Sequence, residues 1–317
     1  MTAVGVGARA RLVLAVASAA ALFAFAWPLV LRAAPTGSAQ TGGGLDAPLV
    51  FTLVLPALLV LMLAEVASGG IDAKALAMLG VLSAIGAALR PLGAGTAGIE
   101  TEFFLLVLAG RVFGPAFGFL LGSTTLFASA LLTGGVGPWL PFQMLAASWV
   151  GLGAGLLPPA RGRLEMVLLV AYGAAAALAF GLLMNLWFWP FLAGADSPVS
   201  YMPGAPLLDN LQRLVLFSLA TSAAWDLGRA ITTVLLVGLT GPAVLAVLRR
   251  AARHAAFGAV PVFGTAGGPA VEAAPRVGGP GVGAATPGAE AAPPAAGWSG
   301  YPPSVNRSAN SAPATSE

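Results

Sequence analysis

The stretch LEMVLLVAYGAAAALAFGLLMNLWFW, from Leu164 to Trp189, decides the fold class of this chain. It contains one charged residue, Glu165, and it is longer than the ~20 residues that a helix needs to cross a hydrocarbon layer of ~30 Å. A helix satisfies all of its backbone polar groups within the segment, as lipid requires. We therefore interpret the stretch as a membrane-spanning helix.

Similar apolar segments occur on both sides of it, separated by short joints rich in Gly, Pro or charge. The first exceeds the ~7 to 15 apolar residues of a cleavable signal peptide, so we expect it to be retained. The others before Leu164 follow at the spacing of successive spans. The segments before it are Leu12 to Leu31, Pro48 to about Ala67, Ala75 to Leu89, Ile99 to Phe113, one that ends at about Leu132, and Trp139 to Leu157. After it, the apolar pattern runs from Leu211 to Leu248 and is interrupted by Asp226 and Arg229.

Composition supports a membrane protein. Hydrophobic residues make up 58% of the chain and charged residues only 9%, and the mean hydropathy is +0.88. A soluble protein of this size carries roughly a quarter charged residues. The net charge of +3 comes from basic residues scattered singly or in pairs beside apolar segments, which is typical of membrane topology and not of nucleic-acid binding.

Basic residues also predict the topology, because Lys and Arg concentrate on the cytoplasmic side. If the N-terminus is inside and Leu211 to Leu227 does not cross separately, eight spans result and both termini are cytoplasmic. If that segment crosses as a ninth span, the cluster of Arg249, Arg250 and Arg253 moves outside. The excess of basic residues on the cytoplasmic side then nearly vanishes. With eight spans, the residues placed outside are Arg32, Arg90 and Arg213, and those inside are Arg9, Arg11, Lys74, Arg111, Arg161, Arg163, Arg249, Arg250 and Arg253.

The predicted fold class is therefore an all-α integral membrane protein, a polytopic helical bundle of about eight spans. We divide it into two additional N-terminal helices (residues 1–70), a six-helix substrate-binding core (71–253) and a tail (254–317). The tail consists mainly of Gly, Pro, Ala and Ser. Such a segment buries too little apolar surface to offset its ordering entropy, so we expect it to be disordered and cytoplasmic.

Several kinds of chemistry are excluded. The only lysine is Lys74 and the only histidine is His254, so the chain has no GxxxxGK[ST] phosphate loop, no HExxH metal site and no histidine-based triad. It also contains no cysteine, which removes thiolate metal sites. We predict no catalytic residue, no metal and no cofactor, and thus no enzyme.

Polar groups close to apolar spans are costly and are candidates for function. Glu100 and Glu102 begin the fourth segment, where they could bind substrate or could simply complement a helix dipole. In GGVGPWLPFQM, Gln143 places an amide one turn into the membrane and could face a ligand or another helix. Trp139 is either part of the same site or an interfacial anchor.

A second polar cluster lies at the predicted outer end of the seventh segment. Asn185 and Trp187 could line a site for a flat organic ligand, although indoles also serve as interfacial anchors. Asp226 and Arg229 are three residues apart on one helix face, which favours a structural ion pair. Apart from that pair, the candidates fall toward the outer leaflet, as a receptor for an external solute requires.

Small residues repeat every four positions in LAMLGVLSAIGAALR, at Gly80, Ala84 and Ala88. A stripe of this kind allows close helix packing. It could serve ordinary packing within the chain or form a docking face for a separate membrane subunit.

Taken together, residues from about Ala73 to Arg253 resemble a substrate-binding S component of an energy-coupling factor (ECF) transporter. The resemblance is carried by the small-residue helix, the glycine-rich loop Pro91 to Gly98, IETEFFLLVLAGRVFGP, AFGFLLGSTTLFASALLTGG, GPWLPFQMLAASWVGLGAGLLP, SAAWDLGRA and GPAVLAVLRR. The N-terminal spans and the tail lie outside it.

The resemblance implies a six-helix core with its ligand near the outer face beneath the glycine-rich loop. It also implies partners, namely a transmembrane coupling protein and ATPase subunits, with the S component toppling in the bilayer to deliver its ligand. Members bind vitamins and related micronutrients, and this sequence is most similar to the predicted cobalamin-type components of actinobacteria. The alternatives are a proton-coupled secondary transporter that uses Glu100 or Glu102, and a membrane scaffold whose tail recruits partners.

Overall fold

The structure is a computed structural model that describes residues 8–30, 47–68, 73–93, 96, 98–191 and 197–256. The chain divides into two compact units, Met1–Pro261 and Val262–Glu317, and every described residue lies in the first. The predicted tail falls outside the described residues, except that His254 to Ala256 belong to the last helix.

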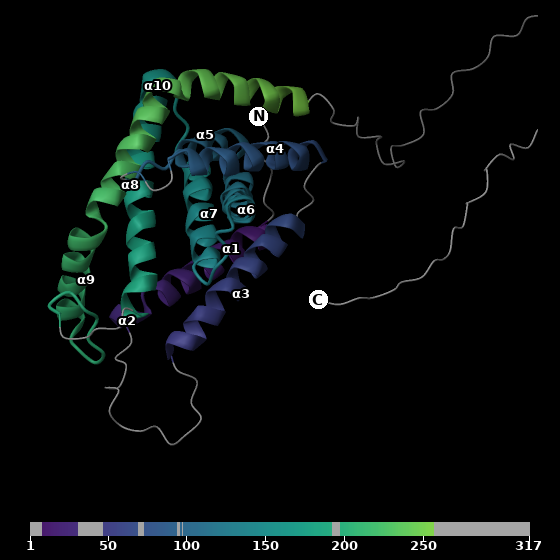
Figure 1. The fold of residues 1–317 in the computed structure, drawn as a ribbon. Helices are drawn as coiled ribbons and strands as arrows, with labels where there is room; N and C mark the ends of the chain where they lie inside the picture. Colours follow the sequence, from purple (N-terminus) through teal and green to yellow (C-terminus); the bar gives the residue numbers. More distant parts are fainter. Residues whose placement is uncertain are drawn as a thin grey trace, which may run out of the picture. The chain divides into compact units, whose positions relative to one another are not determined.

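All the regular structure in the described part is helical, as the sequence predicts (Figure 1). The N-terminal part holds α1 (Ala8–Phe25), α2 (Trp27–Val30) and α3 (Ala47–Ser68). The remaining helices are α4 (Ala73–Leu89), η1 (Arg90–Leu92), α5 (Phe103–Phe113), α6 (Pro115–Thr133), α7 (Leu140–Leu156), α8 (Gly162–Phe188), η2 (Trp189–Phe191), α9 (Leu207–Thr221) and α10 (Ala223–Ala256).

Eight of these helices are apolar enough to belong in a membrane. Four of them are long enough to cross it alone, namely α4, α6, α8 and α10. The apolar parts of the other four, α1, α3, α5 and α7, are shorter. Large apolar side chains on several of them face outward, such as Val81 at 58% and Leu239 at 79% exposure. Lipid is the solvent that accommodates such a surface. The predicted polytopic membrane bundle is thus confirmed.

The helix α9 is different from the others. It contains Asp209 and Arg213, and it is not among the candidate spans found in the described residues. This agrees with the eight-span prediction, in which Leu211 to Leu227 does not cross separately. The apolar pattern that follows is one helix, α10, which changes direction along its length (Figure 1). It contains Pro242, and a proline inside a helix is a usual cause of a bend.

Glycines bring α5, α6 and α7 into backbone contact. Gly114, with φ at 94°, turns the chain between α5 and α6, so that Gly110 and Gly118 approach each other. A Cβ on either of these would meet the carbonyl oxygen of Gly151 on α7. Small residues at such crossings let membrane helices pack closely, and this packing holds α5 against α6 and α7.

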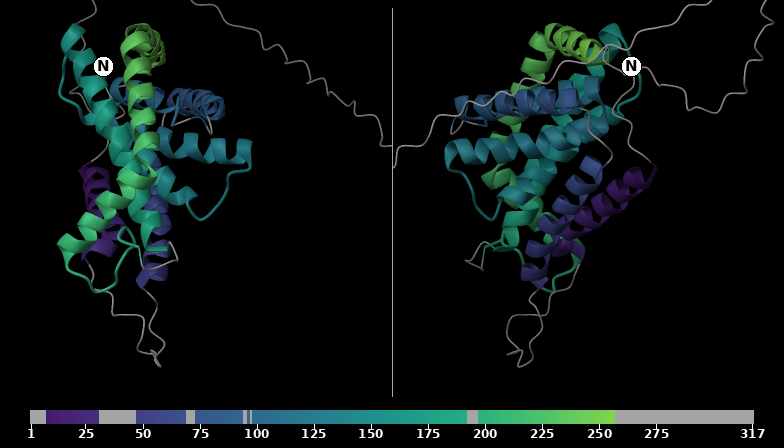
Figure 2. Two further views of the ribbon diagram at one scale, coloured as in Figure 1. Left: turned by 60° about the vertical axis from the view of Figure 1, so that its left-hand side comes forward. Right: turned by 90° about the vertical axis from the view of Figure 1, so that its right-hand side faces the viewer.

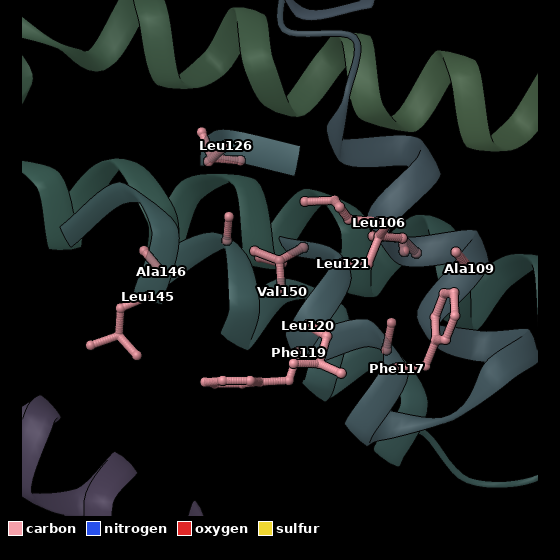
Figure 3. Close-up of a cluster of buried hydrophobic side chains, with 14 of the residues drawn as sticks. Leu106, Ala109, Phe117, Phe119, Leu120, Leu121, Leu126, Leu145, Ala146 and Val150 are labelled. Atoms are coloured by element: carbon pink, nitrogen blue, oxygen red, sulfur yellow. The ribbon is translucent and has the colours of Figure 1, made fainter. Parts of the chain in front are cut away.

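The core of the bundle is built on the same three helices. Leu106 on α5, Leu121 on α6 and Leu145 on α7 are fully buried, and they lie among other apolar side chains in Figure 3. In the N-terminal part, α1 and α3 lie side by side (Figures 1 and 2). The indole N–H of Trp149 on α7 donates a 3.0 Å hydrogen bond to Ser18 on α1, which attaches that part to the bundle.

The structure differs from the predicted boundaries at one functionally important place. The fourth segment was expected to become helical at Ile99, but α5 begins at Phe103 with Glu102 as its N-cap residue. The hydroxyl of Thr101 donates to the Leu89 carbonyl at 2.7 Å, and this bond holds the chain outside the helix. Glu100 therefore lies in the link between α4 and α5 and not within a span.

Candidate ligand-binding site

The link before α5 is held against the start of α10. Gly98 has φ at 76°, and a Cβ there would collide with the carbonyl oxygen of Trp225. This backbone contact places Glu100 beside α10. Its carboxylate accepts hydrogen bonds from the indole N–H of Trp225 at 2.9 Å and from Nε and Nη2 of Arg229, each at 2.8 Å.

Arg229 is the centre of this site. Its Nη1 donates to Asp226 at 2.7 Å, which confirms the ion pair expected from the i, i+3 spacing. Its guanidinium lies 5.1 Å from the ring centre of Phe180 and 5.7 Å from that of Phe103. Only 5% of the residue is exposed, and a buried cation requires a paired anion, which Glu100 and Asp226 supply. We call Glu100, Asp226 and Arg229 the acidic network.

Asn185 is joined to the acidic network through serines at the junction of α9 and α10. Its side-chain amide donates to Ser222 at 2.6 Å and to Ser218 at 3.0 Å. The hydroxyl of Ser222 lies 3.1 Å from the Asp226 carboxylate, to which it can donate. A candidate residue on α8 thus lies two hydrogen bonds away from the acid that orients Arg229.

Glu102 and Gln143 meet through a third residue, Arg90. Nε of Arg90 lies 3.3 Å from the Glu102 carboxylate, and its Nη2 donates to Gln143 at 3.3 Å. Glu102 is 1% exposed, and its Oε2 has no hydrogen-bond partner among the described residues. Burial, together with the negative charge of Glu100, raises the pKa of Glu102 to about 7.

The two tryptophan candidates lie differently. Trp187 packs against Phe142 with 4.7 Å between ring centres, and its indole N–H has no partner within the described chain. The Trp139 side chain lies over Gly137 and is 41% exposed. The structure thus brings together Glu100 with Asn185, and Glu102 with Gln143, and it leaves Trp139 at the surface.

Arg90 and Trp225 did not stand out in the sequence as site residues. The available signal for Arg90 was its charge on the side predicted to be outside, since a cation beside apolar spans needs a partner. No comparable signal exists for Trp225, because its role depends on the contact between the link and α10. The Asp226–Arg229 pair was visible, but its bond to a carboxylate 129 positions earlier in the chain was not.

The opposite ends of α5, α8 and α10 carry a second set of charges. Glu165 on α8 accepts hydrogen bonds from Arg111 at 2.9 Å and from Arg249 at 2.6 Å. Arg111 also donates to the carbonyl of Leu157 at 2.9 Å. We call Arg111, Glu165 and Arg249 the basic triad, because it contains two cations and one anion.

One apolar cavity of about 260 Å³ lies between α7 and α8. Phe180 lines it and also packs on Arg229, so the cavity and the acidic network share a wall. The other lining residues are Ala146, Trp149, Val150, Tyr172, Ala175, Ala176, Ala179 and Leu183. Within the described residues, no group of His, Cys, Asp and Glu side chains could hold a metal ion.

These features define a helical membrane protein with a polar site where the α4–α5 link meets α10. Comparison with known families assigns it further. Residues 74–240 match the family described as "ECF transporter, substrate-specific component", and this is more than half of the chain. The chain therefore belongs to that family and is a transport subunit, not an enzyme. The matched residues begin in α4 and leave out α1 to α3. No curated protein and no solved structure matches the chain.

Proposed function

We propose that this chain binds a vitamin-like micronutrient on the outer side of the membrane, at the site between the α4–α5 link and the start of α10. The observation that carries the proposal is the hydrogen-bonded chain from Asn185 to Glu100 through Asp226 and Arg229. Polar groups inside a membrane bundle are costly and mark substrate pathways by default. Here these polar groups come from distant positions within the residues that match the family, and they lie together at one end of the helical bundle.

The basic triad supports the proposed orientation. Further arginines lie at the helix ends that carry the triad, namely Arg161 and Arg163 at the start of α8 and Arg250 and Arg253 near the end of α10, and such a concentration of arginine is typical of the cytoplasmic face. The acidic network would then face outward, with both termini inside. S components of this family pair with an energising module, and we propose a transmembrane coupling protein and ATPase subunits as the partners of this chain.

The exposed face of α4 is the docking surface that we propose for the coupling protein. Gly80, Ala84 and Ala88 are exposed, whereas Leu79 and Leu82 on the opposite face are buried. Nothing in the described chain lies within 4 Å of the place where a Cβ on Gly80 would be. Packing within the described part of the chain therefore does not use this stripe, which supports the docking interpretation made from the sequence.

Cobalamin is the ligand suggested by the sequence resemblance. The cavity of about 260 Å³ between α7 and α8 is smaller than the ~300 to 1,000 Å³ typical of organic-ligand sites, so it would have to widen to hold a corrin ring. Titration of the detergent-purified chain, followed by the absorbance of cobalamin, tests this ligand directly. Saturable binding that weakens in Gln143→Ala would support it, and no binding would remove cobalamin alone.

The transport function has its own test. The chain is reconstituted in liposomes with the coupling protein and ATPases of its own genome, and uptake of labelled vitamins is measured with and without internal ATP. We expect uptake to require ATP hydrolysis and to survive an uncoupler. Uptake that stops with the uncoupler and does not need the ATPases would instead favour proton coupling, for which the buried Glu102 is the candidate.

A further inference from the structure

The carboxylate of Glu100 is held in the way that a receptor holds a bound acid. Arg229 donates to it through Nε and Nη2, both at 2.8 Å, which is the two-pronged geometry that a guanidinium offers to any carboxylate. The indole of Trp225 adds a third N–H at 2.9 Å. All three donors come from the first turns of α10, and the acceptor comes from a link outside the helices.

The guanidinium of Arg229 has contacts other than those with Glu100 that hold it in place. Nη1 of Arg229 is bound to Asp226, and the rings of Phe103 and Phe180 lie beside the guanidinium. These contacts leave Nε and Nη2 aimed at the place that the Glu100 carboxylate occupies. A preorganised guanidinium of this kind recognises a carboxylate with little further loss of entropy.

Glu100 is the member of the site that can leave. Its side chain is 18% exposed, compared with 6% for that of Arg229, and Trp225 beside it is 39% exposed. It lies before the first turn of α5, so its departure breaks no helix. The exchange of one carboxylate for another also leaves the number of buried charges around Arg229 unchanged, which avoids an unpaired buried cation.

We infer that the Glu100 carboxylate occupies the position where a ligand carboxylate binds. The transported ligand is then a small organic acid whose carboxylate replaces that of Glu100 on Arg229 and Trp225. This inference rests on the proposed function and adds the substrate class. The apolar body of the acid would lie toward Phe180, which also lines the cavity between α7 and α8.

The first experiment asks whether the vacated position is a carboxylate site. Glu100→Ala is purified in detergent, and its unfolding midpoint is measured in acetate, in acetamide and in chloride at equal ionic strength. We expect acetate alone to raise the midpoint by several degrees, and Trp225→Phe in the same background to reduce that rise. Glu100→Gln, which keeps the side-chain volume, serves if the alanine variant does not fold. Equal midpoints in acetate and acetamide would overturn the inference.

A matched control uses the other buried carboxylate. Glu165→Ala also removes an acid bound by two hydrogen-bonded arginine groups, but no receptor for an external ligand is inferred there. We expect no acetate-specific rise in this variant. An equal rise in both variants would mean that any broken ion pair takes up acetate, and it would count against the inference.

The second experiment asks whether a ligand can displace Glu100 in the unmodified chain. Benzoate and benzamide are compared as probes, because they share an aromatic body and differ in the carboxylate. We expect the wild-type chain to bind benzoate in preference to benzamide, and Glu100→Ala to bind benzoate at least tenfold more tightly, because the competing internal carboxylate is gone. Benzoate binding by the variant but not by the wild type would show a purely structural ion pair.

The outcomes separate this inference from the proposed function. A chain that supports ATP-dependent uptake of a neutral ligand, with no preference for benzoate, keeps its function and loses the inference. Cobalamin binding that is unaffected by Trp225→Phe and Glu100→Ala would also count against the inference alone, because the side chains of cobalamin end in amides. Loss of uptake for every vitamin tested would count against the proposed function itself.

Discussion

The acidic network and the basic triad are two versions of one arrangement with the charges exchanged. In the first, a guanidinium that is 6% exposed lies between two carboxylates, which are 18% and 14% exposed. In the second, a carboxylate that is 5% exposed lies between two guanidinium groups, which are 12% and 35% exposed. Each connects α10 to elements far away in the sequence, but the net charges are −1 and +1.

The difference lies in where the partners come from. The basic triad joins residues that are all within helices, and Arg111 is further fixed by the backbone carbonyls of Leu157 and Ala160. In the acidic network, one carboxylate belongs to the same helix as Arg229, and the other belongs to Glu100, which lies outside the helices. A charge held by a link can be exchanged for that of a ligand, whereas a charge held by packed helices mainly fastens them together. We therefore propose that ligand binding belongs to the acidic network, and that the basic triad holds the helices together.

Removal of Arg229 should have the largest effect. Arg229→Ala leaves Glu100 and Asp226 without their common cation, and breaking a buried ion pair in this way costs about 3–5 kcal/mol. Thermal unfolding in detergent should show a loss of stability greater than that of Glu165→Ala, where Arg111 retains its carbonyl partners. Arg229→Lys, which keeps the charge but not the two-pronged geometry, should fall between them. A larger loss in Glu165→Ala would contradict the comparison.

A methyl group at Gly98 should disrupt the acidic network alone. Gly98→Ala combines a left-handed backbone conformation with a collision against the Trp225 carbonyl, so the link should withdraw from α10 and the unfolding midpoint should fall. Gly134→Ala is the matched control, because φ is 66° there but the space is open. It should cost only the ~1–2 kcal/mol of that conformation. Equal unfolding midpoints for the two variants would show that the link does not depend on this contact.

The pH dependence of stability should report on Glu102. Its pKa is raised from 4.5 to about 7 in the folded chain, so between these values the folded state holds a proton that the unfolded state has released. Stability should therefore be highest below this window and should fall as the pH rises through it. Glu102→Gln should flatten the profile of the unfolding midpoint between pH 4.5 and 7. An unchanged slope would place the responsible group elsewhere.

The smallest effect is expected from Arg249→Ala. Its side chain is 35% exposed, and ion pairs with such access to solvent contribute about 1 kcal/mol or less. Glu165 keeps Arg111 as a partner, so neither the unfolding midpoint nor ligand binding should change much. A loss comparable with that of Arg229→Ala would mean that the two ends of the bundle are equally fastened.

The candidate residues were partly visible in the sequence because an acid or amide near an apolar span is conspicuous. This reasoning found Glu100, Glu102, Gln143 and Asn185, and their role in binding stays a prediction. It could not supply their partners. Arg90 meets Gln143 across 53 positions of the chain, and no local pattern indicates which of several arginines a given carboxylate will face.

The membrane class, the approximate helices and the absence of familiar catalytic motifs follow from the sequence by itself, because lipid imposes its demands on each segment separately through length and hydropathy. The motifs between Ala73 and Arg253 also carried the family resemblance. Only the tertiary structure decided that α5 begins at Phe103, that the small-residue stripe of α4 faces outward, and that the Glu100 carboxylate binds Arg229. These features depend on close contact between distant segments, such as Gly98 against Trp225, and such contacts exist only once the helices have packed.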